Sequence, residues 1–143
     1  MANLRILLDV NILLDVLARR EPHYVHSAGV WACIESGQAR GMVSAHCVTT
    51  LYYLINRHTT RAKAILAIND LLRVFSIATV DQAVINQAMA MNWRDLEDAV
   101  QACAAANAGA HYLVTRNLGD FTGSPVPVLG PGEFLALMAA GGR

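Results

Sequence analysis

Three aspartates stand where an α/β fold could bring their side chains together. Asp9 closes the apolar run Leu4–Leu8, Asp120 follows a second short apolar run, and Asp98 lies at the start of an alanine-rich segment. Carboxylates beyond the ends of parallel strands lie at the edge of the sheet where such folds bind ligands. Converging carboxylates repel one another unless a cation joins them, and Mg²⁺ or Mn²⁺ prefers oxygen ligands. Metal-assisted phosphodiester hydrolysis is therefore the first hypothesis.

The elements that must position these aspartates follow from the hydrophobic pattern. Strands are predicted over residues 4–8, 41–44, 74–77, 111–115 and 126–128, and helices over residues 12–20, 24–35, 48–55, 64–72, 82–91, 95–108 and 131–140. Alternating strands and helices predict an α/β protein with three layers, α/β/α, around a central, mostly parallel sheet of four to five strands. At 143 residues the chain is expected to form a single domain over residues 1–143.

Composition narrows the classes of function. The 11 basic and 11 acidic residues give a net charge of zero, which argues against a protein that coats nucleic acid and leaves room for a local basic patch. Three widely spaced cysteines and no secretory pattern at the N-terminus indicate a reducing, cytoplasmic setting. No apolar run is long enough to span a membrane. Because 55% of the residues are hydrophobic, we expect a homodimer or a protein partner to cover part of the surface.

Some candidate residues also have a purely structural explanation. Asp95 and Asp98 are spaced like a helix N-cap and the third residue after it, so the start of a helix would explain both. A carboxylate that faces small alanines must nevertheless be paired or bound to metal, which favours Asp98 as a site residue. Asp95 and Glu97 are additional candidates. Asn11 is expected to cap the first helix, and Asp15 is expected to be solvated.

Three motifs follow one another along the chain. They are Leu7-Leu8-Asp9-Val10-Asn11, Asp95-x-Glu97-Asp98-Ala99 and Leu113-Val114-Thr115-Arg116-Asn117-x-x-Asp120-Phe121. Together, in this order, they resemble the PIN domain family. The family is best known for the toxin ribonucleases of bacterial toxin–antitoxin pairs. The resemblance implies a parallel sheet, an acidic pocket that holds Mg²⁺ or Mn²⁺, cleavage of RNA, a homodimer and an antitoxin partner. It implies that Asp9 and Asp98 are catalytic metal ligands, joined by Asp120 or Asn117.

The sequence departs from the family pattern at one acidic position. The usual second acid falls on Thr50, which cannot carry the charge but can orient a water molecule or a substrate oxygen. This loss favours a rival interpretation, a degenerate PIN fold that binds RNA or a protein without cutting it. A metal-dependent phosphatase for small substrates is a third possibility. The residues expected to contact substrate are Asn11, Thr50, Thr115 and Arg116, with His46 as an additional candidate.

The remaining polar clusters have surface roles as their first interpretation. His23 and His26 lack further ligands at metal-binding spacing, so both are expected at the surface. The group Arg57, His58, Arg61 and Lys63 is interpreted as solvated helix surface, with a patch that tracks phosphates as the alternative.

Overall fold

The computed structural model describes residues 3–141. Its sheet has five strands in the order β3-β2-β1-β4-β5, and all four pairings are parallel. The strands are β1 (Arg5–Leu8), β2 (Arg40–Ser44), β3 (Ser76–Ala78), β4 (Tyr112–Val114) and β5 (Val128–Leu129). The predicted fold class is confirmed. The expected domain over residues 1–143 includes residues 1, 2, 142 and 143, which lie outside the described range.

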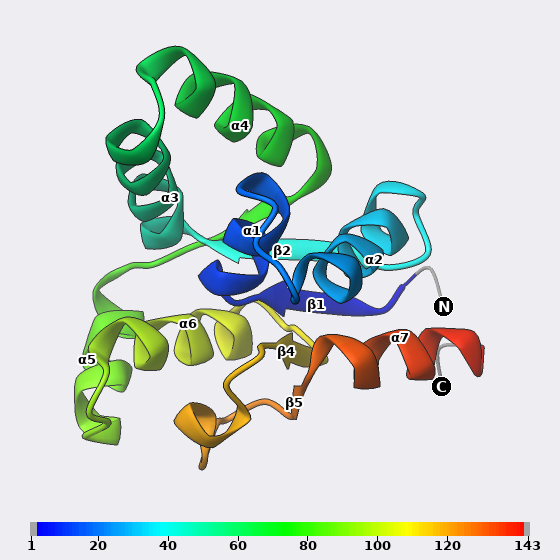
Figure 1. The fold of residues 1–143 in the computed structure, drawn as a ribbon. Coiled ribbons are helices and arrows are strands. Elements are labelled where there is room, and N and C mark those ends of the chain that lie inside the picture. Colours follow the sequence, from blue (N-terminus) through cyan, green and yellow to red (C-terminus); the bar gives the residue numbers. More distant parts are fainter. Residues whose placement is uncertain (1–2, 142–143) are drawn as a thin grey trace.

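Helices cover both faces of this sheet (Figure 1). They are α1 (Val10–Leu17), α2 (Tyr24–Glu35), α3 (Ala45–His58), α4 (Arg61–Val74), α5 (Gln82–Met91), α6 (Leu96–Asn107) and α7 (Pro131–Ala139), with a 3-10 turn η1 (Leu118–Phe121). Helices α5 and α6 pack on one face, whereas α1 to α4 and α7 contribute to the core on the other. Within residues 3–141, no helix has the length and apolar character that a membrane crossing requires.

Alternation along the central strand builds the two halves of the core. Ile6 and Leu8 face the cluster that includes α1, α2 and α7, while Leu7 faces the alanine-rich side of α6. Successive side chains of a strand point to opposite faces, so β1 is buried on both sides. The alanines of α6 leave little side-chain bulk between helix and sheet. The start of α6 is thereby held close to the end of β1.

Two predicted details of these elements are wrong. Helix α1 begins at Val10, and its N-cap is Asp9, whose side chain accepts a hydrogen bond from the Asn11 backbone N–H, so Asn11 is not the cap. The third strand begins at Ser76, because helix α4 continues to Val74 and buries Leu71. The other elements lie within a few residues of their predicted positions.

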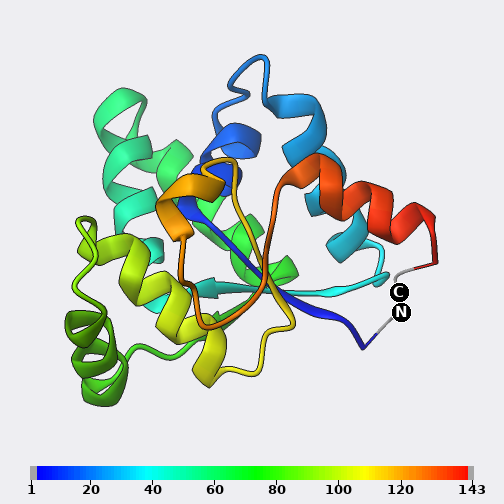
Figure 2. The same cartoon turned by 90° about the horizontal axis from the view of Figure 1, so that it is seen from below.

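The order of the strands creates a crevice at one end of the sheet. From β1 the chain builds β2 and β3 toward one edge and then crosses to the other side of β1 for β4 and β5. Ligands of parallel α/β folds bind at such a switch point, outside the carboxyl ends of the two strands. Asp9 follows β1 there and Thr115 follows β4. The turn η1 lies beside α6 at this end of the sheet (Figure 2).

Candidate active site

Asp9 is a buried carboxylate whose two oxygen atoms are both hydrogen-bonded. Only 1% of the residue is exposed. Its Oδ1 accepts a hydrogen bond from Gln101 Nε2 at 3.0 Å, and its Oδ2 accepts one from the Thr115 hydroxyl at 2.8 Å. A buried carboxylate is costly unless such donors replace water. Asp9 and Thr115 thus meet at the edge of the sheet, where β1 and β4 end.

Gln101 is a central residue of the site that the sequence analysis missed. Its Nε2 also donates to Asp98 Oδ1 at 3.4 Å, so one amide group bridges the carboxylates of Asp9 and Asp98. Its Oε1 accepts hydrogen bonds from the Val10 backbone N–H and the Cys47 thiol. Gln101 is fully buried within the run 99–105, whose other members are small or apolar. A lone polar residue in such a run was the sequence signal that could have identified it.

Asp98 combines a structural position with an unusual electrostatic one. Asp95 caps helix α6 by accepting a hydrogen bond from the Asp98 backbone N–H at 3.1 Å, which confirms the helix-start explanation for Asp95. The pKa of Asp98 is raised to about 7, first by burial and then by the negative charges of Asp95, Asp9, Asp120 and Glu97. Five carboxylates therefore influence one another at this end of the sheet.

A surface cleft of about 450 Å³ opens next to these carboxylates. It is lined by Trp93, Arg94, Asp95, Asp98, Gly119, Asp120 and Thr122. Asp120 comes from η1 and Asp98 from α6, so the cleft brings together acids that are far apart in the sequence. Asp9 lies beneath this cleft, linked to it through Gln101 and Asp98. We refer to this cleft as the acidic cleft.

Thr50 faces a carboxylate from the opposite helix. Its hydroxyl lies 3.2 Å from Glu97 Oε2 and 3.3 Å from the backbone oxygen of His46. The Nδ1 atom of His46 lies 2.6 Å from the Ser44 hydroxyl. Burial lowers the pKa of His46, and the nearby Glu97 carboxylate partly offsets this effect. Glu97 therefore supplies a negative charge beside the position where the family pattern places its second acid.

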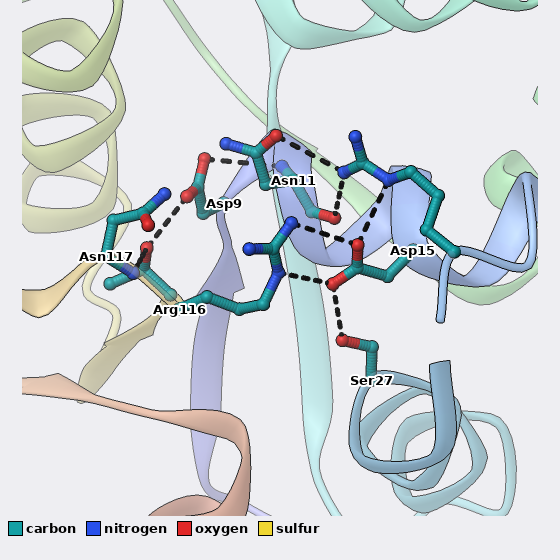
Figure 3. Close-up of polar contacts among 8 residues, drawn as sticks. Asp9, Asn11, Asp15, Ser27, Arg116 and Asn117 are labelled. Carbon is teal, nitrogen blue, oxygen red and sulfur yellow. Dashed lines mark hydrogen bonds and ion pairs between the residues drawn. The ribbon is translucent and has the colours of Figure 1, made fainter. Parts of the chain in front are cut away.

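A second polar network lies beside the first (Figure 3). Arg116 forms two ion-pair contacts with Asp15, and the Asn117 backbone N–H donates to the Thr115 hydroxyl at 3.0 Å. Asn11 accepts hydrogen bonds from Arg20 through its backbone and side-chain oxygens. The prediction that Asp15 is solvated is wrong, because Asp15 is fully buried. One of its arginine partners, Arg20, lies five positions away, and the other, Arg116, lies 101 positions away.

The donors at the acidic cleft suit a hard divalent cation in their chemistry. They are the carboxylate oxygens of Asp95, Asp98 and Asp120 and the Thr122 hydroxyl, and Mg²⁺ and Mn²⁺ prefer such oxygen ligands. The raised pKa of Asp98 indicates repulsion that a cation would relieve. Within residues 3–141, no three histidine, cysteine, aspartate or glutamate side chains are grouped so that they could hold a metal ion. The Gln101 amide, and not a shared centre, joins Asp9 to Asp98.

The fold and the site define a class of protein, a parallel α/β domain with carboxylates gathered at the switch point beside its central strand. The family model described as PIN domain matches residues 5–119. Because this match covers most of the chain, the chain belongs to the PIN domain family. The resemblance found in the sequence motifs is confirmed.

Individual relatives agree with this assignment. The chain is 23% identical over 135 residues to Ribonuclease VapC1 from Aquifex aeolicus, covering 91% of this chain and 92% of the relative. Among solved structures, VapC20 from Mycobacterium tuberculosis, described as a sarcin–ricin loop cleaving toxin, matches with a TM-score of 0.63 and 17% identity, over 76% of this chain and 86% of that one. A toxin–antitoxin complex from Klebsiella pneumoniae matches with a TM-score of 0.66 and 21% identity, over 87% and 96%.

Proposed function

We propose that this protein is a metal-dependent endoribonuclease that hydrolyses phosphodiester bonds in RNA, as the toxin of a toxin–antitoxin pair. The observation that carries the proposal is the bridge from Asp9 through Gln101 to Asp98 at the crevice between β1 and β4, beside a cleft that also holds Asp120. The relatives described as a ribonuclease and as a loop-cleaving toxin support the same reaction class.

The ligands that we propose for Mg²⁺ or Mn²⁺ are Asp9, Asp98 and Asp120, with Asn117 as a further oxygen donor. When bound, the cation supplies a Lewis acid that activates water and stabilises charge on the phosphate. Asp9 and Asp98 are held in place by Gln101 and Thr115 before any cation arrives.

The other residues of the site have proposed roles in binding and orientation. Thr50 and Glu97 together replace the usual second acid, because Glu97 provides the charge and the Thr50 hydroxyl holds its Oε2. Asn11 and Arg116 are assigned to substrate contacts, with Asp95 and His46 at the margin of the same surface. Of these, Arg116 is the only charged group suited to a phosphate oxygen. The predicted substrate contact of Thr115 is wrong, because Thr115 is fully buried and its hydroxyl holds Asp9.

A second candidate function is a PIN domain that binds RNA or protein without cutting it. Thr50 in place of an acid favours it, as does the lack of a preassembled group of three metal-binding side chains within residues 3–141. This candidate predicts RNA binding that does not depend on Mg²⁺ or Mn²⁺ and no cleavage at any metal concentration.

Cleavage of RNA by the purified protein separates the two candidates. We expect cleavage with Mn²⁺ or Mg²⁺, none with a chelator, and none for Asp98→Asn in the presence of metal. The control is Asp70→Asn, because Asp70 is an exposed aspartate of α4 that pairs with Arg73 away from the site. Cleavage by Asp98→Asn at the rate of the control would contradict the assigned site, and RNA binding without cleavage by the unaltered protein would favour the second candidate.

Two protein partners belong to the proposal, an antitoxin and a second copy of this chain. The toxin–antitoxin complex that matches the fold supports the first. Exposed apolar side chains on the hairpin of α3 and α4 support the second, since Tyr53 is 58% and Leu66 is 65% exposed. Trp31 and Val30 are buried in the core and do not contribute to this surface. We further propose that the reaction takes place in the cytoplasm, where RNA would be available as the substrate.

Light scattering on the purified protein tests the homodimer. We expect a mass of twice 15.4 kDa at micromolar concentration. A monomer at all concentrations would contradict the homodimer and leave the exposed face to the antitoxin.

A further inference from the structure

A second cleft lies on the other side of the loop that carries Asn117. Its volume is about 360 Å³, and it is lined by Pro22, His23, His26, Ser27, Arg116, Asn117, Leu118, Gly130 and Pro131. No acidic residue is among these lining residues, in contrast to the acidic cleft with its three aspartates. We refer to this second cleft as the histidine–arginine cleft. Its basic and polar lining suits an anion.

Arg116 is held in this cleft by a fully buried carboxylate. Its Nε donates to Asp15 Oδ2 at 2.7 Å and its Nη2 donates to Asp15 Oδ1 at 3.1 Å, so the pairing is bidentate. The Ser27 hydroxyl and Arg20 Nε complete the hydrogen bonds of Asp15 at 2.9 and 3.1 Å. Figure 3 shows the Arg116 guanidinium between Asp15 and the pair of Asp9 and Asn117. A guanidinium held by two hydrogen bonds along one edge has little freedom left to lose when it binds a ligand.

The network keeps an excess positive charge. Two arginines share one aspartate, which leaves a net charge of +1. Among the described residues, no hydrogen bond uses Arg116 Nη1, and the Arg116 side chain remains 21% exposed. The N–H groups of Arg116 Nη1 are therefore fixed in direction and left without a hydrogen bond among the described residues. A phosphate oxygen is the partner that such a group binds best.

The two clefts are neighbours through residues 115–117. Thr115 donates to Asp9, Asn117 donates to Thr115, and Arg116 lies between them in sequence. Asn117 lines the histidine–arginine cleft, while Gly119 and Asp120 of the same loop line the acidic cleft. An RNA strand whose cleaved phosphate lies at the acidic cleft would pass this loop with its next phosphate.

We propose that the histidine–arginine cleft binds one RNA phosphate next to the phosphate that is cleaved, with Arg116 as its main contact, His23 and His26 as further donors, and Asp15 as the positioning residue for Arg116. The inference rests on the proposed nuclease function. Among the described residues that line the cleft there is no Trp, Tyr or Phe, so a stacked base is a poor occupant. Contacts to phosphates carry no sequence information, so this subsite should act on all RNA sequences alike.

The first test introduces a negative charge into the cleft. His26 is exposed on the first turn of α2, where an acid is favoured by the helix dipole, so His26→Glu should fold normally. The matched control is His111→Glu, the same change at an exposed residue just before β4, at the opposite end of that strand. His111 Nδ1 accepts a hydrogen bond from the Arg5 backbone N–H, and a glutamate oxygen can accept the same bond. Binding of a short fluorescent single-stranded RNA is measured by anisotropy in a chelator over a range of salt concentrations.

We expect His26→Glu to raise the Kd about tenfold, because a hydrogen-bonded phosphate contact is lost. The slope of log K against log salt should become shallower by about 0.7, the value for one phosphate contact on a single strand. In cleavage assays its KM should rise while kcat stays the same. The control should match the unaltered protein. Equal Kd, slope and KM for the two variants would overturn the subsite.

The second test addresses Asp15 as a positioning residue. Asp15→Asn makes the network more positive by one charge, which on charge alone would tighten the binding of RNA. We expect weaker binding instead, with Arg116→Lys and Asp15→Asn similarly impaired, because both lose the bidentate pairing that fixes the guanidinium. Tighter binding by folded Asp15→Asn would contradict the positioning role. If Asp15→Asn does not fold, Arg116→Lys, which keeps the charge, decides the point by the same measure.

The binding assay separates this inference from the proposed function. It contains no metal, so it does not depend on cleavage. A protein that binds RNA with the predicted slope changes but never cleaves would retain the subsite and lose the nuclease. If the His26→Glu variant cleaves RNA as the unaltered protein does, with the same KM, the proposed nuclease function stands and the proposed phosphate subsite is rejected.

Discussion

Replacing Gln101 by glutamate should make the stability of the metal-free protein depend strongly on pH. The Gln101 Nε2 atom lies 3.0 Å from Asp9 Oδ1 and 3.4 Å from Asp98 Oδ1, so Gln101→Glu puts an acid between two others. Two unit charges about 4 Å apart repel by about 4 kcal/mol at an effective dielectric constant of ~20. Keeping the new carboxyl protonated at pH 7 costs about 4 kcal/mol, because its ordinary pKa of about 4.3 lies ~2.7 pH units lower.

Charge repulsion and protonation therefore predict a similar loss of folding stability. Because Asp98 is partly exposed to solvent, we expect this loss to be about 3 kcal/mol at pH 7. The folded-state pKa of the introduced group is raised. The stability relative to the unaltered protein is therefore preserved near pH 4 and lost as the pH rises toward 7. Saturating Mn²⁺ should restore part of it, because a ligand that binds only the folded state stabilises that state.

Urea unfolding at several pH values, in chelator and in Mn²⁺, measures this effect. The control is Gln87→Glu, the same chemical change at an exposed position of α5, where a surface substitution alters stability by no more than about 0.5 kcal/mol. A loss of stability that is equal at pH 5 and pH 8 would refute the reasoning, since it would mean that Gln101 does not lie between ionised carboxylates.

Three further predictions concern the same site. Because the pKa of Asp98 is raised to about 7, its contribution to the stability of the metal-free protein should decrease as the pH rises from about 4 to about 7. For the same reason, calorimetry should show an affinity for Mn²⁺ that increases up to about pH 7 and then levels off. Asp9→Asn should abolish RNA cleavage with little change in Tm. The amide oxygen of the new side chain can still accept a hydrogen bond from Gln101, and the Thr115 hydroxyl can turn to accept one from the new NH₂ group. Cleavage at the normal rate in saturating Mn²⁺ would show that Asp9 is misassigned. Thr50→Glu should increase the affinity for Mn²⁺ and destabilise the metal-free protein, since the new carboxylate would face Glu97; an unchanged affinity in a folded variant would place Thr50 outside the metal site.

The sequence was sufficient for most of the fold because the local patterns were strong. The apolar run before Asp9, the caps at Asp81 and Asp95 and the glycine at position 109 each mark an element boundary through short-range chemistry. The start of β3 was misplaced because Val74 and Phe75 are apolar in either structure. Only their packing shows that α4 continues through Val74 and that Phe75 contacts Trp31 across the core.

The sequence singled out the acids of the site and several polar residues near them, but not Gln101. Asp9 and Asp98 were found because an acid next to buried elements is conspicuous in a sequence. Gln101 was not found because its importance depends on Asp9, a residue 92 positions away. The burial of Asp15 depends in the same way on Arg116, 101 positions away. Long-range partners determine the roles of these residues, and nothing within a few positions of either one indicates the partner.

The central place of β1 in the sheet has a consequence for how the protein is made. Its two neighbours are β2, which follows after about thirty residues, and β4, which is more than a hundred residues further along the chain. During translation β1, β2 and β3 can therefore pair well before β4 leaves the ribosome, and contacts between distant residues form slowly. Until then Asp9 lacks Thr115, and Asp120 has not joined the acidic cleft. A nascent or prematurely ended chain would carry half a sheet but no complete site, so an enzyme that cuts RNA would become active only once its synthesis is nearly finished.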